Sequence, residues 1–239
     1  MDQGKGCQLK FLGIIASRLD SSRLPGKALQ KVHGTPLIQF VVQRVASVRG
    51  LEGFVLATTD RPTDDNLAEF AERAGVRCFR GETHDVAKRL LDCALEYEAD
   101  YFVRINGDCV FLDPELIEAG IAVCRSRRPD LVTNIQLRSF PYGISVEIVR
   151  TRALFDVYEH FGGDDREHVT TWMYRNPSGF KIVNIHSGKP FSSAIRLVVD
   201  TQEDLWNFTR IVDDLGAAAA TASYTEVLKA AMRVEGSNR

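Results

Sequence analysis

Short, continuous apolar runs alternate with segments of helical periodicity through the first half of this 239-residue chain. The runs predict strands at 11–15, 54–58, 76–79 and 101–105, because a strand buried on both faces of a sheet is apolar throughout. Helices are expected at 35–49, 63–74, 84–98 and from 113 onwards, with Thr35 and Thr63 as N-caps of the first two. This alternation favours an α/β fold in which helices cover both faces of a mostly parallel sheet.

The regular alternation of strands and helices ends after about residue 130. Strands are predicted at 130–134, 144–149, 180–185 and 195–199, with helices at 151–160, 164–176, 201–215 and 223–234. We expect a single domain over 1–239, with a core of about 11–134 and 193–215 and a peripheral helix at 223–234. The segment 135–192 is expected to be an excursion from the sheet that carries a dimerisation arm, which predicts a homodimer.

Overall charge and cysteine usage exclude several functional classes. The net charge of −2 argues against general nucleic-acid binding. Apolar runs fall far short of the roughly 20 residues that span a bilayer, so no membrane association is expected. The five cysteines include no Cys-x-x-Cys pair, and their odd number without an export signal favours a cytoplasmic protein.

The loop after the first predicted strand carries concentrated positive charge. Residues 1–34 have a net charge of +4, which leaves about −6 for the rest of the chain. Arg18, Arg23 and Lys27 lie on this loop, and their side chains are of the types that bind phosphate oxygens. Pro25-Gly26 predicts a turn that brings Lys27 back toward the arginines.

Ligands of parallel sheets bind beyond the carboxyl ends of the strands, so this loop predicts a triphosphate site. A solvated basic loop is the alternative, since the chain contains neither a Walker loop nor a Gly-x-Gly-x-x-Gly motif. Asp108 and Asp200 each follow a predicted strand, where two carboxylates could hold Mg²⁺ against phosphate oxygens. Asp200 could instead cap the helix that follows it.

The basic loop also has a specific family resemblance. Arg18, Ser21, Arg23, Leu24, Pro25, Gly26 and Lys27 resemble the A-R-x-x-S-T-R-L-P-G-K segment of the cytidylyltransferases that make CMP-activated sugars. The nearest branch is the spore coat polysaccharide biosynthesis protein F group, homologous to CMP-Kdo synthetase. Further similar segments are Ala57–Asp60, Arg80-Gly81 with Asp85-Val86, Arg104–Cys109, Arg166–Thr170 and Val199–Asp204, so the resemblance covers about residues 11–214.

This resemblance implies a three-layer nucleotidyltransferase fold, like that of nucleotide-diphospho-sugar transferases, and transfer of CMP from CTP to an acidic acceptor with release of pyrophosphate. It implies that Arg18, Arg23 and Lys27 are catalytic and that Asp108 and Asp200 bind Mg²⁺. The expected nucleotide-binding residues are Ala16, Ser17, Arg18, Ser22, Arg23, Lys27, Arg80, Asp85 and Asn106. The expected acceptor-binding residues are Asn134, Glu147, Arg166 and His168.

Four departures from the family pattern bear on the acceptor and on the basic loop. Ser17 and Asp20 stand where the branch usually has Ala and Gly, Val110 replaces a proline, and Ser145 replaces an aspartate. The commonest acceptor of the family is a 2-keto sugar acid such as Kdo or a nonulosonate, and Ser145 keeps a small phosphonate as the alternative. A glycosyltransferase-like protein that binds nucleotide sugars is a further alternative, although the Asp-x-Asp triplet that many of those enzymes use is absent.

Overall fold

A seven-stranded mixed sheet forms the centre of the molecule, whose computed structural model describes residues 8–188 and 195–236. The strands are β1 (Phe11–Ala16), β4 (Gly53–Thr59), β5 (Arg77–Gly81), β6 (Tyr101–Asn106), β7 (Leu131–Thr133), β8 (Glu147–Arg150) and β9 (Ile182–Asn184). Their order across the sheet is β5-β4-β1-β6-β8-β7-β9. Only β8 runs antiparallel to its neighbours β6 and β7. The expected mixed, mostly parallel sheet is therefore confirmed.

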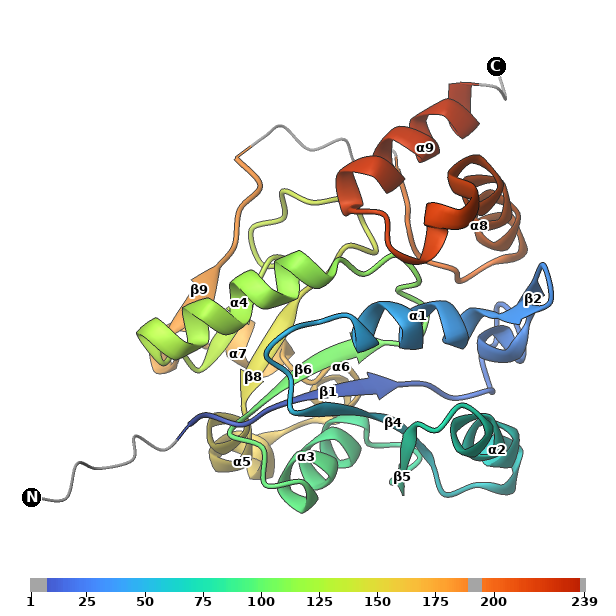
Figure 1. Ribbon diagram of the computed structural model, residues 1–239. Coiled ribbons are helices and arrows are strands. Elements are labelled where there is room, and N and C mark those ends of the chain that lie inside the picture. Colours follow the sequence, from blue (N-terminus) through green and yellow to red (C-terminus); the bar gives the residue numbers. More distant parts are fainter. Residues whose placement is uncertain (1–7, 189–194, 237–239) are drawn as a thin grey trace, which may run out of the picture.

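Helices cover both faces of this sheet (Figure 1). The helices are α1 (Leu37–Ala46), α2 (Asp65–Arg73), α3 (Val86–Glu96), α4 (Pro114–Arg127), α5 (Thr151–Val157), α6 (Gly163–His168), α7 (Thr171–Arg175), α8 (Gln202–Leu215) and α9 (Tyr224–Gly236). One apolar core lies under α1, α2, α4, α8 and α9, and a second lies under α3, α5 and α7. The sheet separates the two cores, which gives the three layers that the sequence predicts.

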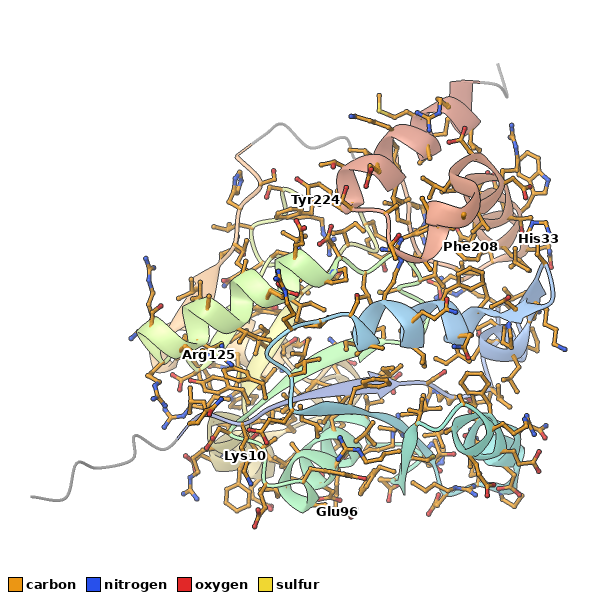
Figure 2. All side chains as sticks on the ribbon, viewed as in Figure 1. Lys10, His33, Glu96, Arg125, Phe208 and Tyr224 are labelled. Carbon is orange, nitrogen blue, oxygen red and sulfur yellow. The ribbon has the colours of Figure 1, made fainter. Side chains whose placement is uncertain are left out.

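Aromatic contacts join the C-terminal helices to the sheet layer. Phe208 of α8, labelled in Figure 2, packs edge-on against Phe40 of α1 at 5.1 Å between ring centroids. It also packs against Phe111 at 5.0 Å, with the two rings tilted by 53°. Arg44 of α1 is fully buried beside them and donates hydrogen bonds to the carbonyl oxygens of Leu112, Ala219 and Ala222. These contacts fix the loop after β6, which carries Asp108, against α1 and the C-terminal segment.

Two helix starts were predicted wrongly. Thr35 and Pro36 form strand β3 (Thr35–Pro36), which pairs with β2 (Lys31–Val32) across His33 and Gly34. Both turn residues have positive φ, as a two-residue hairpin turn requires, so α1 begins one residue after Pro36. Thr63 lies inside the 3₁₀ helix η2 (Pro62–Asp64), and α2 begins at Asp65.

The second half of the chain departs further from expectation. The segment predicted as an excursion contributes β8 and β9 to the central sheet, and the part of 135–192 that is described shows no dimerisation arm. Residues 195–199 form no strand but run extended, with one bridge between Tyr142 and Arg196. The helix predicted at 164–176 is divided into α6 and α7 by Val169, whose φ of 41° is strained for a β-branched residue.

Candidate active site

A polar cavity of about 430 Å³ opens at the carboxyl ends of β1 and β6. Its lining residues are Ala16, Ser17, Arg18, Asp20, Ser21, Ser22, Arg23, Lys27, Val86, Arg89, Arg104, Asn106, Gly107, Asp108, Tyr142, Glu167, His168 and Asp200. The cavity brings together all three predicted catalytic cations, both predicted metal ligands and seven of the nine predicted nucleotide-binding residues. It therefore joins segments that are far apart in the sequence.

The basic loop is anchored by its backbone. Gly26 adopts a φ of 65° in the Pro25-Gly26 turn, which the N–H of Lys27 closes by donating to the carbonyl oxygen of Leu24 at 3.2 Å. The N–H of Gly26 donates to the carbonyl oxygen of Leu19 at 2.9 Å and ties the turn to the start of the loop. Leu24 is buried in the core, and the N–H of Leu19 is held by the carboxylate of Asp64 at 2.7 Å. Asp64 is itself fully buried and also accepts a hydrogen bond from Thr59. The loop is thus fixed at both ends while its charged side chains face the cavity.

Lys27 joins the two predicted metal ligands. Its Nζ donates to Asp108 Oδ2 and to Asp200 Oδ1, each at 2.7 Å, so these two oxygens lie no more than twice that distance apart. Burial opposes the charge on Lys27, but the two carboxylates outweigh this effect and raise the pKa of Lys27 above its ordinary value. Burial likewise opposes ionisation of Asp200, and Lys27 and Arg23 overcome it and lower the Asp200 pKa.

The two arginines of the loop are also paired with carboxylates. Arg23 contacts Asp200 at 3.1 Å, and Arg18 contacts Asp20 at 3.0 Å and Glu167 at 3.2 Å. Asp20 also binds Arg61 at 2.7 Å, and although burial opposes its charge, Arg61 and Arg18 lower the Asp20 pKa. The negative charge of Asp20 is therefore neutralised by two arginines, Arg18 of the basic loop and Arg61, which follows β4.

The donor set fits a magnesium ion that is bound together with a nucleotide. Among residues 8–188 and 195–236, no group of three or more histidine, cysteine, aspartate or glutamate side chains forms a complete metal site. Asp108 and Asp200 nevertheless converge on one point, and Mg²⁺ in proteins commonly takes one or two carboxylates and fills its other positions with phosphate oxygens and water.

Two predicted nucleotide-binding residues do not line the cavity. Arg80 donates to the carbonyl oxygens of Thr59 and Arg61 at 3.0 and 2.8 Å and pairs with Asp65. Asp85 is buried as the N-cap of α3, where it accepts from the N–H of Lys88 at 2.7 Å.

Among the predicted acceptor-binding residues, only His168 lines the cavity. Asn134 is buried and bonds the backbone of Ile144 and Val146. Arg166 binds Asp85 at 2.9 Å. Glu147 is buried and accepts hydrogen bonds from Thr170, Tyr174 and Arg104, with Arg104 at 2.6 Å. Asn134 therefore supports the neighbouring backbone, Arg166 and Glu147 support other side chains, and Glu147 orients Arg104 toward the cavity.

A second cavity of about 440 Å³ adjoins the first through Arg104 and His168, which line both. Its other lining residues are Ile135, Gln136, Arg138, Thr170, Thr171 and Tyr174. The Nη1 of Arg138 is buried without a hydrogen-bond partner among the residues described, and its guanidinium lies 5.3 Å from the ring centroid of Tyr142. Burial, with the nearby Glu147 carboxylate, raises the pKa of Tyr174, so its hydroxyl keeps its proton.

Sequence reasoning missed Asp64, Arg104, Arg138 and Glu167 as site residues. Arg104 and Glu167 lie within motifs that carry the family resemblance, so the resemblance could have predicted that both lie near the cavity. Asp64 lies in a polar Pro-Thr-Asp-Asp segment that is typical of an exposed helix start, and Arg138 lies in a segment without periodicity.

Comparison with known proteins identifies the family and the fold. The profile of a family described as Cytidylyltransferase matches residues 12–232. The chain is 30% identical over 201 residues to the spore coat polysaccharide biosynthesis protein SpsF of Bacillus subtilis, covering 81% of this chain and 82% of SpsF. A cytidylyltransferase structure from Leptospira borgpetersenii superposes with a TM-score of 0.87 at 26% identity, over 96% of this chain and 95% of that one.

Two more distant structures share the fold. A CMP:2-keto-3-deoxy-manno-octonic acid synthetase complexed with CTP gives a TM-score of 0.63 at 17% identity, over 85% of this chain and 98% of that chain. Rv0371C of Mycobacterium tuberculosis, solved in complex with manganese, gives 0.55 at 16% identity, over 82% and 96%. No helix in the described part of the chain is long and apolar enough to cross a membrane.

Proposed function

The chain belongs to the cytidylyltransferase family and is a nucleotidyltransferase, and from this premise we propose that it transfers CMP from CTP to an acidic small molecule. The observation that carries the proposal is the convergence of Arg18, Arg23 and Lys27 with Asp108 and Asp200 in one cavity. A site for a metal-bound triphosphate needs cations for the phosphates and carboxylates for the metal, and this cavity supplies both.

In the proposed reaction, an acceptor oxygen attacks the α-phosphorus of CTP in line with the bond to the β-phosphate. The new bond forms between the acceptor oxygen and the α-phosphorus, and an acceptor hydroxyl gives up its proton to solvent. The bond from the α-phosphorus to the bridging oxygen breaks, and pyrophosphate leaves with that oxygen and its negative charge. Lys27, Arg23 and Arg18 face that leaving group from the loop and stabilise its developing charge. The protein otherwise acts by positioning, because phosphoryl-type transfer needs little covalent chemistry from side chains.

We assign the nucleotide side of the cavity to Ala16, Ser17, Ser22 and Asn106, which all line it. Asp108 and Asp200 would hold Mg²⁺, which when bound neutralises part of the triphosphate charge. Arg80 supports this side indirectly, through its hydrogen bonds to the carbonyl oxygens of Thr59 and Arg61 at the end of β4. Asp85 also supports this side indirectly, because it accepts a hydrogen bond from the N–H of Lys88 at the start of α3.

We assign the acceptor to the second cavity. Arg104, Arg138 and His168 line it, and the Nη1 of Arg138 has no partner among the residues described. Two guanidinium groups favour an acceptor that carries a carboxylate or a phosphonate. The similarity to SpsF, which is named for polysaccharide biosynthesis, favours a sugar acid such as Kdo or a nonulosonate over a phosphonate.

A pyrophosphate-release assay tests the proposal. The purified chain, CTP and Mg²⁺ are incubated with a 2-keto sugar acid, with a small phosphonate, or with the neutral sugar that matches the sugar acid. Turnover with an acidic acceptor and none with the neutral sugar is expected, because only the acid binds the two arginines. Which acid reacts identifies the acceptor class. No turnover with any acceptor, while controls show that CTP binds, would refute CMP transfer to an acid.

A further inference from the structure

Every cation on the basic loop is already bound to a carboxylate of the same cavity. Lys27 holds Asp108 and Asp200 at 2.7 Å each, Arg23 holds Asp200 at 3.1 Å, and Arg18 holds Glu167 at 3.2 Å. The Lys27 and Asp200 side chains are only 16% and 9% exposed, so water screens their interaction weakly. The groups expected to bind phosphate and the groups expected to bind metal therefore satisfy one another in this structure.

We propose that the Lys27 ammonium occupies the position of the metal ion between Asp108 and Asp200. The metal and the triphosphate then bind together, because the charged side chains exchange their ion-pair partners. This inference rests on the proposed function and adds to it the condition that the metal and the triphosphate bind together. In the exchange, the Lys27 ammonium leaves the two carboxylates for phosphate oxygens, and the metal takes the carboxylates that Lys27 releases.

The charges predict that either ligand alone binds poorly. A metal ion that enters alone must displace the partly buried ammonium of Lys27 and leave that ammonium without a partner. A triphosphate that enters alone draws Lys27 away and leaves Asp108 and Asp200 unpaired beside further negative charge. When both enter, Lys27 pairs with phosphate oxygens and the two carboxylates bind the metal. Every charged group then has an opposite charge beside it, and the new contacts of both ligands offset the cost of breaking the ion pairs.

The backbone need not move for this exchange. Leu24 and Ala28, on either side of the Pro25-Gly26 turn, are buried, and Gly26 is bonded to Leu19 at 2.9 Å. The Lys27 side chain has rotatable bonds along its whole length, and Arg23 is 63% exposed and free to turn. Rotation of these two side chains is sufficient to move their charges from the carboxylates to a phosphate in the same cavity.

Binding of Mn²⁺ without nucleotide, followed by electron paramagnetic resonance of the free ion, tests the inference. The full chain, Lys27→Met and Lys27→Gln are compared, and Lys31→Met is the matched control because Lys31 is an exposed lysine of the neighbouring β2 that does not line the cavity. We expect both Lys27 variants to bind Mn²⁺ about 10-fold more tightly than the wild type, which lies within the usual range of coupling between sites. Lys31→Met should bind as the wild type does.

A lysine that only binds phosphate gives a different result. Its removal would leave the Mn²⁺ affinity unchanged or weaker in both Lys27 variants, and that outcome overturns the inference. Two variants are used because Met removes both charge and hydrogen bond, whereas Gln keeps a donor for the carboxylates. Thermal melting of each variant confirms that the protein measured is folded.

A structure with Mn²⁺ and CTP but no acceptor provides the second readout. Lys27 is expected on phosphate oxygens, with Asp108 and Asp200 free of it. A Lys27 that still bridges both carboxylates while metal and CTP are bound would refute the exchange. Failure of CMP transfer to every acceptor, with the Mn²⁺ result as expected, counts against the proposed function and leaves the exchange of partners intact.

Discussion

Replacing Gly143 with alanine tests how the cavity is assembled from distant segments. Gly143 follows Tyr142, which lines the first cavity, and the carbonyl oxygen of Tyr142 accepts a hydrogen bond from the N–H of Leu197 at 2.7 Å. Three residues after Leu197, the same extended segment reaches Asp200. This crossing therefore connects the Tyr142 wall of the first cavity to one of the proposed metal ligands.

The cost of Gly143→Ala follows from its geometry. Gly143 has a φ of 103°, and a Cβ built there would lie 2.4 Å from the carbonyl carbon and oxygen of Leu197 and 2.9 Å from the N of Val198. These are backbone atoms, so no side-chain rotation relieves the contact. Backbone strain and overpacking each cost about 1–3 kcal/mol, so Gly143→Ala should lower the free energy of unfolding by roughly 3–5 kcal/mol.

Gly75→Ala is the matched control for this variant. Gly75 also has positive φ, 66°, but a Cβ there meets no atom within 4 Å, so it carries strain without a clash. Urea unfolding should show a loss of about 1–2 kcal/mol for Gly75→Ala and at least twice that for Gly143→Ala. Equal losses in the two variants would refute the claim that the crossing at Gly143 is closely packed.

Three further variants test other parts of the account. Arg44→Met leaves three buried carbonyl oxygens without their donor and should lower the free energy of unfolding in urea by about 3 kcal/mol or more, whereas a change below about 1 kcal/mol would contradict this role. Lys27→Ala should lower turnover by about 10²–10³ with unchanged circular dichroism, and wild-type turnover would mean that the loop is merely solvated. Arg138→Ala should raise KM for the acidic acceptor by about 10-fold and leave KM for CTP unchanged, and equal effects on both would place Arg138 outside the acceptor site.

The sequence predicted the centre of the site because that part depends on a few well-defined patterns. The apolar runs of β1 and β6 are unambiguous, and the loops that follow parallel strands must meet at one edge of the sheet. Asp108 follows β6, whereas Asp200 lies between β9 and α8 and is brought to Asp108 only by tertiary structure, yet both bind the same Lys27. The family resemblance of the basic loop predicted which ligands, a nucleotide triphosphate and Mg²⁺, would bind at this edge of the sheet.

Side-chain partners and irregular backbone were not predictable in the same way. Arg80 and Asp85 lie in segments that match the family, but a matching segment does not say whether a side chain enters the cavity or supports a turn. The break at Val169 depends on a strained φ that no periodicity shows, and it ends α6 at His168, in the middle of the helix expected over 164–176. The extended run at 195–199 has the apolar pattern of a strand but pairs with its neighbours through isolated contacts.

Transfer of a labelled α-phosphate directly tests whether the chain moves CMP from CTP to an acidic acceptor. The chain is incubated with Mg²⁺ and an acidic acceptor, together with CTP, UTP, ATP or GTP labelled with ³²P at the α-phosphate, and the products are separated by charge. We expect label from CTP to move onto the acceptor in proportion to the pyrophosphate released, with little transfer from the other three nucleotides. Label that stays in free nucleotide with every acceptor, or that moves equally from all four nucleotides, would contradict the assignment of a CTP-dependent cytidylyltransferase.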